Sequence, residues 1–111
     1  MAAQSLSLMS VHNLDALFRP ASVAVVGASR RPDRVGAVML RNLLAGGFAG
    51  PILPVDPRYE SIGGVVAYPS PTSLPVVPEL AVLCTPASTI PPLIAELAGL
   101  GTRAACWPTT G

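Results

Sequence analysis

The architecture of this chain follows from one short stretch of its sequence, Ser22-Val23-Ala24-Val25-Val26-Gly27-Ala28-Ser29. Its unbroken apolar, β-branched run predicts a strand that is buried on both faces, as strands of parallel sheets are. Gly27 ends the run with a residue that can adopt turn geometry, and after a short polar, basic loop an apolar periodicity begins again at Val35. A strand, a glycine turn and a helix in this order direct backbone N–H groups and the positive end of a helix at an anion. The stretch therefore predicts a ligand that carries phosphate.

Apolar runs and turn residues alternate along the rest of the chain, and they predict alternating strands and helices. Five strands are expected, at Ser22–Val26, Ile52–Val55, Gly63–Tyr68, Leu80–Cys84 and Arg103–Trp107. Two long helices are expected, from Arg34 or Val35 to Ala45 and from a cap at Ser88 or Thr89 to Gly99 or Gly101, with single helical turns at Leu14–Phe18 and Pro71–Leu74. Short links between such elements give a parallel α/β sheet with right-handed crossovers.

Residues at helical spacing predict which face of each long helix packs on the sheet. In the first helix these positions are Val35, Val38, Met39, Asn42 and Leu43. In the second helix they are Ile90, Leu93, Ile94, Leu97 and Leu100. Each set gives its helix one face for the core.

Composition limits the fold and excludes several classes of function. Of the 111 residues 50% are hydrophobic and 12% are charged, which favours one globular domain over a disordered chain. The formal net charge of +1 excludes the strong basic field typical of nucleic-acid binding. The apolar runs are shorter than the roughly 18 residues of a membrane helix. Residues 1–13 lack a basic start and a long hydrophobic stretch, so a signal peptide is not expected. Cys84 and Cys106 lie in apolar runs and are expected to be buried, reduced thiols, which suits a cytoplasmic protein.

The glycine loop departs from two common nucleotide-binding signatures. A P-loop ends in Gly-Lys-Ser or Gly-Lys-Thr, and the sequence contains neither tripeptide. The dinucleotide fingerprint is Gly-x-Gly-x-x-Gly, yet the next glycine after Gly27 is Gly36. The loop is thus compatible with a phosphate ligand without identifying one.

The end of the second predicted strand leaves two ligands open. Asp56 stands where an acidic residue commonly holds a ribose hydroxyl in NAD-binding folds, or it only stabilises the Asp-Pro turn. Arg58 would instead favour an additional phosphate near the ribose, or it lies in solvent. The carboxyl ends of parallel strands meet at one sheet edge, where open α/β folds bind ligands. The candidate residues at this edge are Gly27, Ser29, Asp56, Arg58, Thr85 and Pro86.

Several motifs follow one another in a recognisable order. They are Leu17-Phe18-Arg19-Pro20, the stretch from Ser22 to Ser29, Val35-Gly36, the stretch from Gly50 to Tyr59, Ala67-Tyr68-Pro69-Ser70 and the stretch from Leu80 to Ala87. This succession closely resembles the N-terminal CoA-binding domain of the NDP-forming acyl-CoA (acetyl-CoA) synthetases, which is related to that of the succinyl-CoA ligase alpha subunit and in some bacterial members is fused to an acetyltransferase domain. The resemblance covers residues 14–111, after a flexible lead-in at residues 1–13. It implies a Rossmann-like CoA-binding fold, here a parallel sheet of about five strands with flanking helices, truncated after the last strand.

The resemblance also implies where coenzyme A lies. The Gly-Ala-Ser loop and the following helix start, which hold the CoA phosphates in the family, correspond to Gly27, Ala28, Ser29, Val35 and Gly36, and Arg30, Arg31 and Arg34 could add charge there. The segment that contacts the nucleotide end corresponds to Val55, Asp56, Pro57 and Arg58, and the segment that lines the thiol-bearing arm to Thr85, Pro86 and Ala87. Asp56 replaces the usual asparagine, and a carboxylate so close to a phosphate is repulsive unless Arg58 offsets it.

The family's phosphorylated histidine and its ATP-grasp nucleotide site belong to later domains, and His12 does not correspond to that histidine. The sequence offers no nucleophile beside a base and no metal cluster. We therefore expect a non-catalytic CoA-binding piece of an acid–CoA ligase, either a fragment or a subunit whose partners are CoA and the remaining synthetase domains in trans. The alternatives are an NAD(H)-binding Rossmann module, which Asp56 would favour, and a structural fragment that binds nothing.

Overall fold

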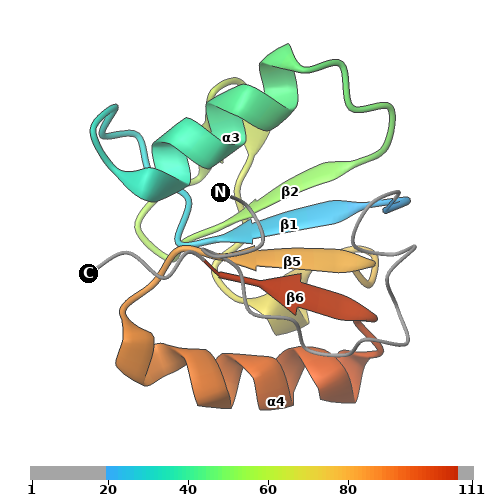
Figure 1. Ribbon diagram of the computed structural model, residues 1–111. Coiled ribbons are helices and arrows are strands. Elements are labelled where there is room, and N and C mark those ends of the chain that lie inside the picture. Colours follow the sequence, from blue (N-terminus) through green and yellow to red (C-terminus); the bar gives the residue numbers. More distant parts are fainter. Residues whose placement is uncertain (1–19, 108–111) are drawn as a thin grey trace.

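In the computed structural model, which describes residues 20–107, a four-stranded parallel sheet lies between two long helices (Figure 1). The strands are β1 (Val23–Val26), β2 (Ile52–Val55), β5 (Leu80–Leu83) and β6 (Ala104–Cys106), arranged in the order β2-β1-β5-β6. The helices are α3 (Val35–Ala45) and α4 (Ile90–Leu100), and a separate antiparallel hairpin consists of β3 (Ser61–Ile62) and β4 (Val65–Val66). The α/β class expected from the sequence is confirmed. The helical turn expected at Leu14–Phe18 lies outside the described residues.

The central strand β1 contributes to two hydrophobic cores, one on each face of the sheet. Val23 and Val25 face the core under α3, whereas Ala24 and Val26 face the core over α4. All four are at most 5% exposed. Because a helix covers each face, the strand has no polar side, which is why its sequence is a continuous apolar run rather than an alternating one.

The face of α3 that packs on the sheet differs from the expected one. The buried residues of this helix are Gly36, Ala37 and Leu40, with Met39 and Leu43 packed against the same core. Val35 is 41% exposed and Asn42 is also exposed, so these two expectations were wrong. The reason is a close approach, because the position that a Cβ would occupy on Gly36 is 2.0 Å from the carbonyl oxygen of Gly27. The helix turns its glycine, not Val35, toward the end of β1.

The face of α4 follows the sequence pattern more closely, but its N-terminus does not. Ile90 and Leu97 are buried, and Leu93 and Ile94 pack against the same core. No side chain caps the helix. The hydroxyl of Thr89, one of the two expected caps, instead donates to the Pro86 carbonyl (2.6 Å) within a single 3₁₀ turn that precedes the helix.

The segment predicted as a third strand folds mainly as a hairpin, so the parallel sheet has four strands rather than five. Gly63 and Gly64 form the tight turn between β3 and β4, which a two-residue glycine turn favours. Tyr68 makes a single parallel bridge with Val55 at the edge of the sheet. The helical turn expected near Pro71 is present as a 3₁₀ turn over Pro71–Ser73.

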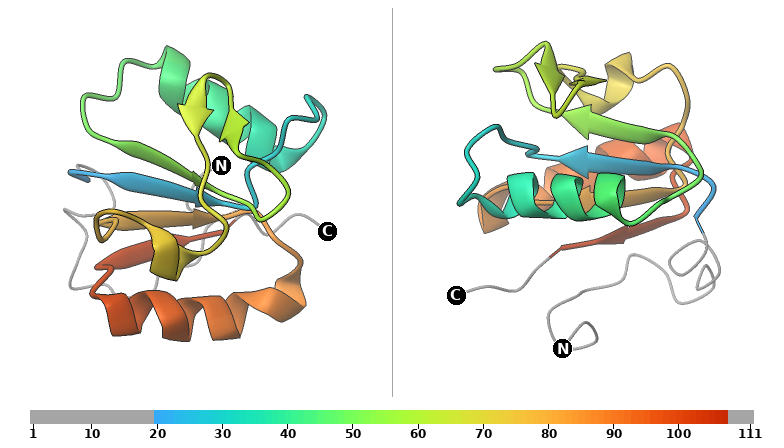
Figure 2. Two further views of the ribbon diagram at one scale, coloured as in Figure 1. Left: turned by 180° about the vertical axis from the view of Figure 1, so that it is seen from behind. Right: turned by 90° about the horizontal axis from the view of Figure 1, so that it is seen from above.

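All four parallel strands end at the same side of the molecule, the left side in Figure 1. Figure 2 shows the helices on opposite faces of the sheet and the hairpin beyond β2, beside α3. Within residues 20–107, none of the helices has the length and hydropathy required to span a membrane. Both cysteines are free thiols, as expected, with Cys106 buried and Cys84 half-buried.

Candidate ligand-binding site

Gly27 lies where the ends of three strands meet. Its N–H donates to the carbonyl of Val55 at the end of β2 (2.8 Å), and the N–H of Cys84, just after β5, donates to the Val26 carbonyl (2.8 Å). Gly27 has a φ of +85°, and a Cβ there would lie 2.7 Å from the carbonyl oxygen of Cys84. Only glycine combines this backbone conformation with so little space. The turn after β1 is thereby held against both neighbouring strands.

The N-terminus of α3 faces this turn without a cap. Arg34, the residue before the helix, makes no side-chain cap hydrogen bond, and the first turn contains no acidic residue. The leading N–H groups of a helix have no intrahelical acceptor and carry partial positive charge. Since Gly36 lets the helix start lie against the Gly27 carbonyl, this positive end is fixed at the sheet edge, where it favours an anion.

A cavity of about 310 Å³ opens at this edge, and we call it the central cavity. It is lined by Gly27, Ser29, Arg34, Val35, Gly36, Asp56, Arg58, Cys84, Thr85 and Pro86. Most of the site residues expected from the sequence thus come together from the loops after β1, β2 and β5. Cys84 was not among the expected site residues, although it directly precedes one of them.

The remaining expected site residues lie around the central cavity rather than in its wall. Ala28 is fully buried beneath the loop. Val55 and Pro57 line an adjoining cavity of about 470 Å³ beside α4, which shares Gly27, Asp56 and Thr85 with the central cavity. Ala87 lines a third cavity, of about 200 Å³, and Arg30 a fourth beside α3.

The Asp56 carboxylate is engaged by Arg58. Its Oδ1 accepts hydrogen bonds from the backbone N–H (2.8 Å) and Nε (3.0 Å) of Arg58, and its Oδ2 accepts one from Nη2 (2.9 Å). The side chain of Asp56 is 6% exposed and that of Arg58 is 63% exposed. Burial by itself would raise the pKa of Asp56, but the hydrogen bonds and the charge of Arg58 outweigh it and hold the pKa below its ordinary value. The carboxylate is charged, and its charge is offset by Arg58.

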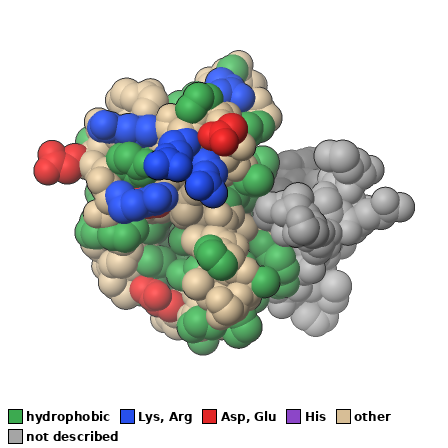
Figure 3. Space-filling view, turned by 90° about the vertical axis from the view of Figure 1, so that its left-hand side faces the viewer, with side chains coloured by type: hydrophobic (Ala, Val, Ile, Leu, Met, Phe, Trp, Pro, Cys, Tyr) green, Lys and Arg blue, Asp and Glu red, His purple; other side chains and the backbone are tan. Residues whose placement is uncertain are grey.

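Tyr59, which the sequence analysis did not single out, contacts two arginines at the rim of the site. The guanidinium carbon of Arg30 is 5.2 Å from the centroid of the tyrosine ring, and that of Arg58 is 5.3 Å from it. Figure 3 looks onto the edge where the strands end and shows arginine side chains gathered on one half of this face. An aromatic residue directly after Arg58 is a visible signal in the sequence, but its contact with Arg30 depends on the fold.

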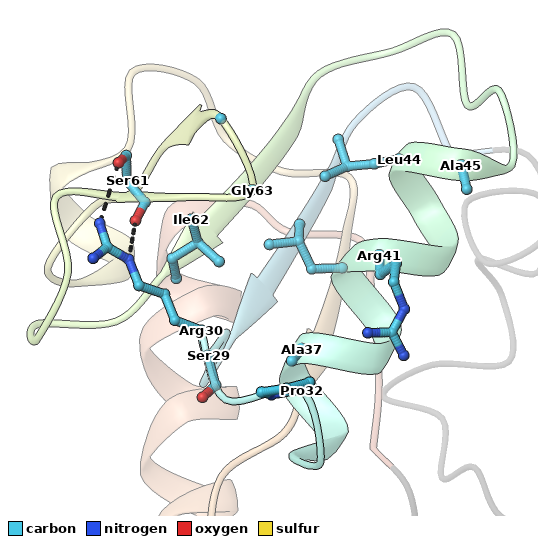
Figure 4. Close-up of a pocket in the computed structure, with 12 residues that line it drawn as sticks. Ser29, Arg30, Pro32, Ala37, Arg41, Leu44, Ala45, Ser61, Ile62 and Gly63 are labelled. Atoms are coloured by element: carbon cyan, nitrogen blue, oxygen red, sulfur yellow. Dashed lines mark hydrogen bonds between the residues drawn. The ribbon is translucent and has the colours of Figure 1, made fainter.

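A larger cavity, of about 740 Å³, lies between α3 and the β3–β4 hairpin. Figure 4 shows Arg30 reaching from the loop after β1 to the hairpin, where its Nε donates to the Ser61 carbonyl (2.9 Å) and its Nη2 to Ser61 Oγ (3.4 Å). Leu44 and Ile62 form part of an apolar wall. This cavity shares Ser29 with the central cavity, but the helix N-terminus and the Gly27 turn lie at the central cavity, which is therefore the better anion site.

Burial disfavours the thiolate form of the cysteine at the site. Burial raises the pKa of Cys84 to about 12, with a smaller contribution from Cys106, and burial raises the pKa of Cys106 to about 11. Because the thiolate is the reactive form, both side chains stay inert near neutral pH. Between Pro20 and Trp107 no group of His, Cys, Asp or Glu side chains is arranged to hold a metal ion.

Comparison with known sequences finds matches over most of this chain. The sequence profile of a family described as a CoA binding domain matches residues 21–109. A trans-feruloyl-CoA synthase from an unidentified prokaryote is 42% identical over 77 residues, which cover 69% of this chain and 11% of that protein. The alpha subunit of an ADP-forming acetate–CoA ligase from Pyrococcus furiosus is 36% identical over 83 residues, which cover 68% of this chain and 17% of the subunit. The chain thus spans less than a fifth of the length of these curated relatives.

Comparison with solved structures finds the same kind of relative. The dinucleotide-forming acetyl-coenzyme A synthetase 1 of Ca. Korarchaeum cryptofilum, solved in complex with phosphate and ADP, superposes with a TM-score of 0.76 at 35% sequence identity. The superposition covers 80% of this chain and 19% of that one. A conserved hypothetical protein from Pyrococcus furiosus superposes with a TM-score of 0.65 at 32% identity, covering 72% of this chain and 67% of that one.

Proposed function

The chain belongs to the family of CoA-binding domains, homologous to the N-terminal part of NDP-forming acyl-CoA synthetases, and from this membership we propose that it binds coenzyme A at the central cavity. The observation that carries the proposal is the pairing of Gly27 with Gly36, which sets an uncapped helix N-terminus against the glycine turn at the sheet edge. That arrangement suits a pyrophosphate. We place the domain at residues 14–111.

We assign the three parts of CoA to the three loops. The pyrophosphate lies against the loop and helix start of Gly27, Ala28, Ser29, Val35 and Gly36. Arg30 extends from the same loop to Tyr59, which Arg58 also contacts, at the nucleotide end. The nucleotide end lies toward Val55, Asp56, Pro57 and Arg58, where the exposed guanidinium supplies positive charge. The pantetheine arm follows Thr85, Pro86 and Ala87 toward Trp107. These four residues line one cavity, and because no charged side chain lines it, the cavity suits the uncharged arm.

We further propose that the chain acts together with other parts of a synthetase. In the reaction of that family an acid, CoA and a nucleoside triphosphate give acyl-CoA, nucleoside diphosphate and phosphate. The described residues provide a place for CoA, and neither cysteine has a pKa suited to nucleophilic attack. The homologues are much longer than this chain, and we propose that phosphate-transferring domains act with it, in the same polypeptide or in trans.

NAD is less well supported than CoA as the ligand. Asp56 stands at the end of β2, where a carboxylate can hold a ribose diol. Three hydrogen bonds from Arg58 already occupy both of its oxygens, and the guanidinium adds a positive charge at the place where NADP-type or CoA-type ligands carry their extra phosphate.

Isothermal titration calorimetry of the full chain with CoA, dephospho-CoA and NAD tests the proposal. We expect CoA to bind more tightly than dephospho-CoA, and NAD to bind more weakly than both. Arg58→Ala should weaken CoA binding by about five- to tenfold and dephospho-CoA binding by less than about twofold, since a charge-assisted contact contributes roughly 1–1.5 kcal/mol. Arg103→Ala, which removes the same charge just before β6 at the opposite end of the sheet, is the matched control. A folded chain that takes up no CoA, or equal losses for both ligands in Arg58→Ala, would contradict the assignment.

A further inference from the structure

We propose that Tyr59 is a positioning residue, whose ring holds Arg30 and Arg58 as a pair that recognises the phosphomonoester on the ribose of the nucleotide ligand. This proposal rests on the proposed function, because it concerns the nucleotide end of the same site. It assigns to Tyr59 the ability of the site to distinguish CoA from dephospho-CoA.

The two arginines come from different loops, and the guanidinium of each lies against the ring of Tyr59. Arg30 belongs to the loop after β1 and Arg58 to the loop after β2, and their guanidinium carbons lie 5.2 and 5.3 Å from the ring centroid. Guanidinium groups at such distances are attracted to the electron-rich face of an aromatic ring. The ring is therefore a common neighbour of two positive charges, and its attraction for both offsets part of their mutual repulsion.

Tyr59 is itself held in place by the core. It is half-buried and packs against the hydrophobic cluster under α3, which contains Leu40 and Ile62. A ring anchored in this way loses little freedom when a ligand binds, so it can fix the arginines before the ligand arrives.

Each guanidinium is also fixed by hydrogen bonds that leave part of it for a ligand. Arg30 uses Nε and Nη2 toward Ser61, and Arg58 uses Nε and Nη2 toward Asp56. Among the hydrogen bonds found within residues 20–107, none uses Nη1 of either arginine. A phosphate can accept hydrogen bonds from these remaining N–H groups.

The charge of the pair matches a phosphomonoester. Arg58 is offset by Asp56, so Arg30 supplies the uncompensated charge of the pair, and Arg34 adds another in the wall of the central cavity. A phosphomonoester carries about −1.5 to −2 at neutral pH. A ligand that lacks this group, such as dephospho-CoA, gains little from the pair.

The test compares Tyr59→Phe with Tyr59→Leu in calorimetric titrations with CoA and dephospho-CoA. Tyr59→Phe keeps the ring and should leave both dissociation constants within about twofold. Tyr59→Leu keeps an apolar side chain but loses the aromatic face. It should weaken CoA binding by about fivefold, with dephospho-CoA within about twofold, since two exposed cation–π contacts contribute roughly this much.

A second variant keeps the test informative if Tyr59→Leu folds poorly. Arg30→Met changes an exposed residue, keeps most of its apolar stem, and should lower the preference for CoA by about two- to fivefold. In the Tyr59→Leu background the same Arg30→Met change should have a smaller effect than in the wild type, because the ring no longer helps to orient Arg30. The proposal is overturned if Tyr59→Leu or Arg30→Met leaves the ratio of the CoA and dephospho-CoA affinities unchanged. It is also overturned if Tyr59→Phe weakens CoA binding as much as Tyr59→Leu does. Wild-type protein that binds no CoA would instead refute the proposed function.

Discussion

Replacing Gly36 by alanine tests the close approach between α3 and the turn after β1. A Cβ at this position would lie 2.0 Å from the carbonyl oxygen of Gly27, 2.9 Å from its carbonyl carbon and 3.0 Å from the Cα of Ala28. All three neighbours are backbone atoms, so no side chain can rotate out of the way. The helix start and the turn must therefore move apart by about 1 Å before the contact becomes tolerable.

Two opposing effects determine the size of the change in stability. Alanine in place of glycine inside a helix contributes about 1 kcal/mol in favour of folding. Overpacking against rigid neighbours costs about 1–3 kcal/mol. At Gly36 the added Cβ would lie only 2.0 Å from a backbone oxygen, so we expect an overpacking cost in the upper part of this range. The net result is a loss of about 1–2 kcal/mol in the free energy of unfolding.

Urea unfolding followed by circular dichroism measures this loss, and Gly99→Ala is its matched control. Gly99 is also a helical glycine, in α4, and a Cβ there would meet no atom within 4 Å. Gly99→Ala should therefore raise the free energy of unfolding by up to about 1 kcal/mol. If the free energy of unfolding of Gly36→Ala equals that of the wild type, or rises as that of Gly99→Ala does, the close approach is not present in the folded protein.

The same substitution should weaken CoA binding. Moving the helix start away from Gly27 separates the first N–H groups of α3 from the bound pyrophosphate, and the interaction of an anion with a helix end is worth roughly 0.3–1 kcal/mol or more. We expect an affinity about three- to fivefold lower in Gly36→Ala and unchanged in Gly99→Ala, measured by calorimetry at a temperature where both variants are folded. Unchanged affinity in Gly36→Ala would show that the ligand does not use the N-terminus of α3.

Two further predictions concern the thiols and the single tryptophan. The folded-state pKa values of Cys84 and Cys106, about 12 and about 11, lie above the 9.0 of an ordinary thiol, so above pH 9 the unfolded state has released protons that the folded state retains. Between pH 9 and about 11 each thiol should then lower the free energy of unfolding by about 1.4 kcal/mol per pH unit. Cys84→Ala should roughly halve this slope in urea titrations, and an unchanged slope in the variant would contradict the raised pKa. Trp107 lines the cavity assigned to the pantetheine arm. CoA and dephospho-CoA should therefore both change its fluorescence, whereas adenosine 3′,5′-bisphosphate, which lacks that arm, should not. A change with all three ligands would place the nucleotide near Trp107 instead.

The sequence predicted most of the sheet because its strands are short and fully apolar, and a glycine or proline directly bounds β1 and β2 at one end. Ile52–Val55 was expected with the bounds that β2 has in the structure, and β1 differs from expectation by one residue. The rotation of α3 could not be predicted, because it depends on contact between Gly36 and a carbonyl nine positions earlier in the chain. Hydrophobic periodicity alone favoured Val35 as a core residue, and it is exposed.

The site was predictable to the extent that topology determines it. Parallel strands bring the loops after β1, β2 and β5 to one edge, and this rule was enough to collect Gly27, Asp56 and Thr85 in one cavity wall. Individual side-chain partners were not predictable in the same way. The contact of Tyr59 with Arg30 joins two loops whose relative position only the folded sheet establishes.

The strand order β2-β1-β5 has a consequence for the dynamics of the domain. A ligand in the central cavity would contact three segments that are far apart along the chain. The sheet could then not open between β1 and either neighbouring strand without breaking some of the contacts to that ligand. Hydrogen exchange of amides deep inside β2 and β5 should then slow together when the cavity is occupied, including amides that the ligand never reaches. A ligand bound at one edge would in this way slow the local opening of the whole sheet.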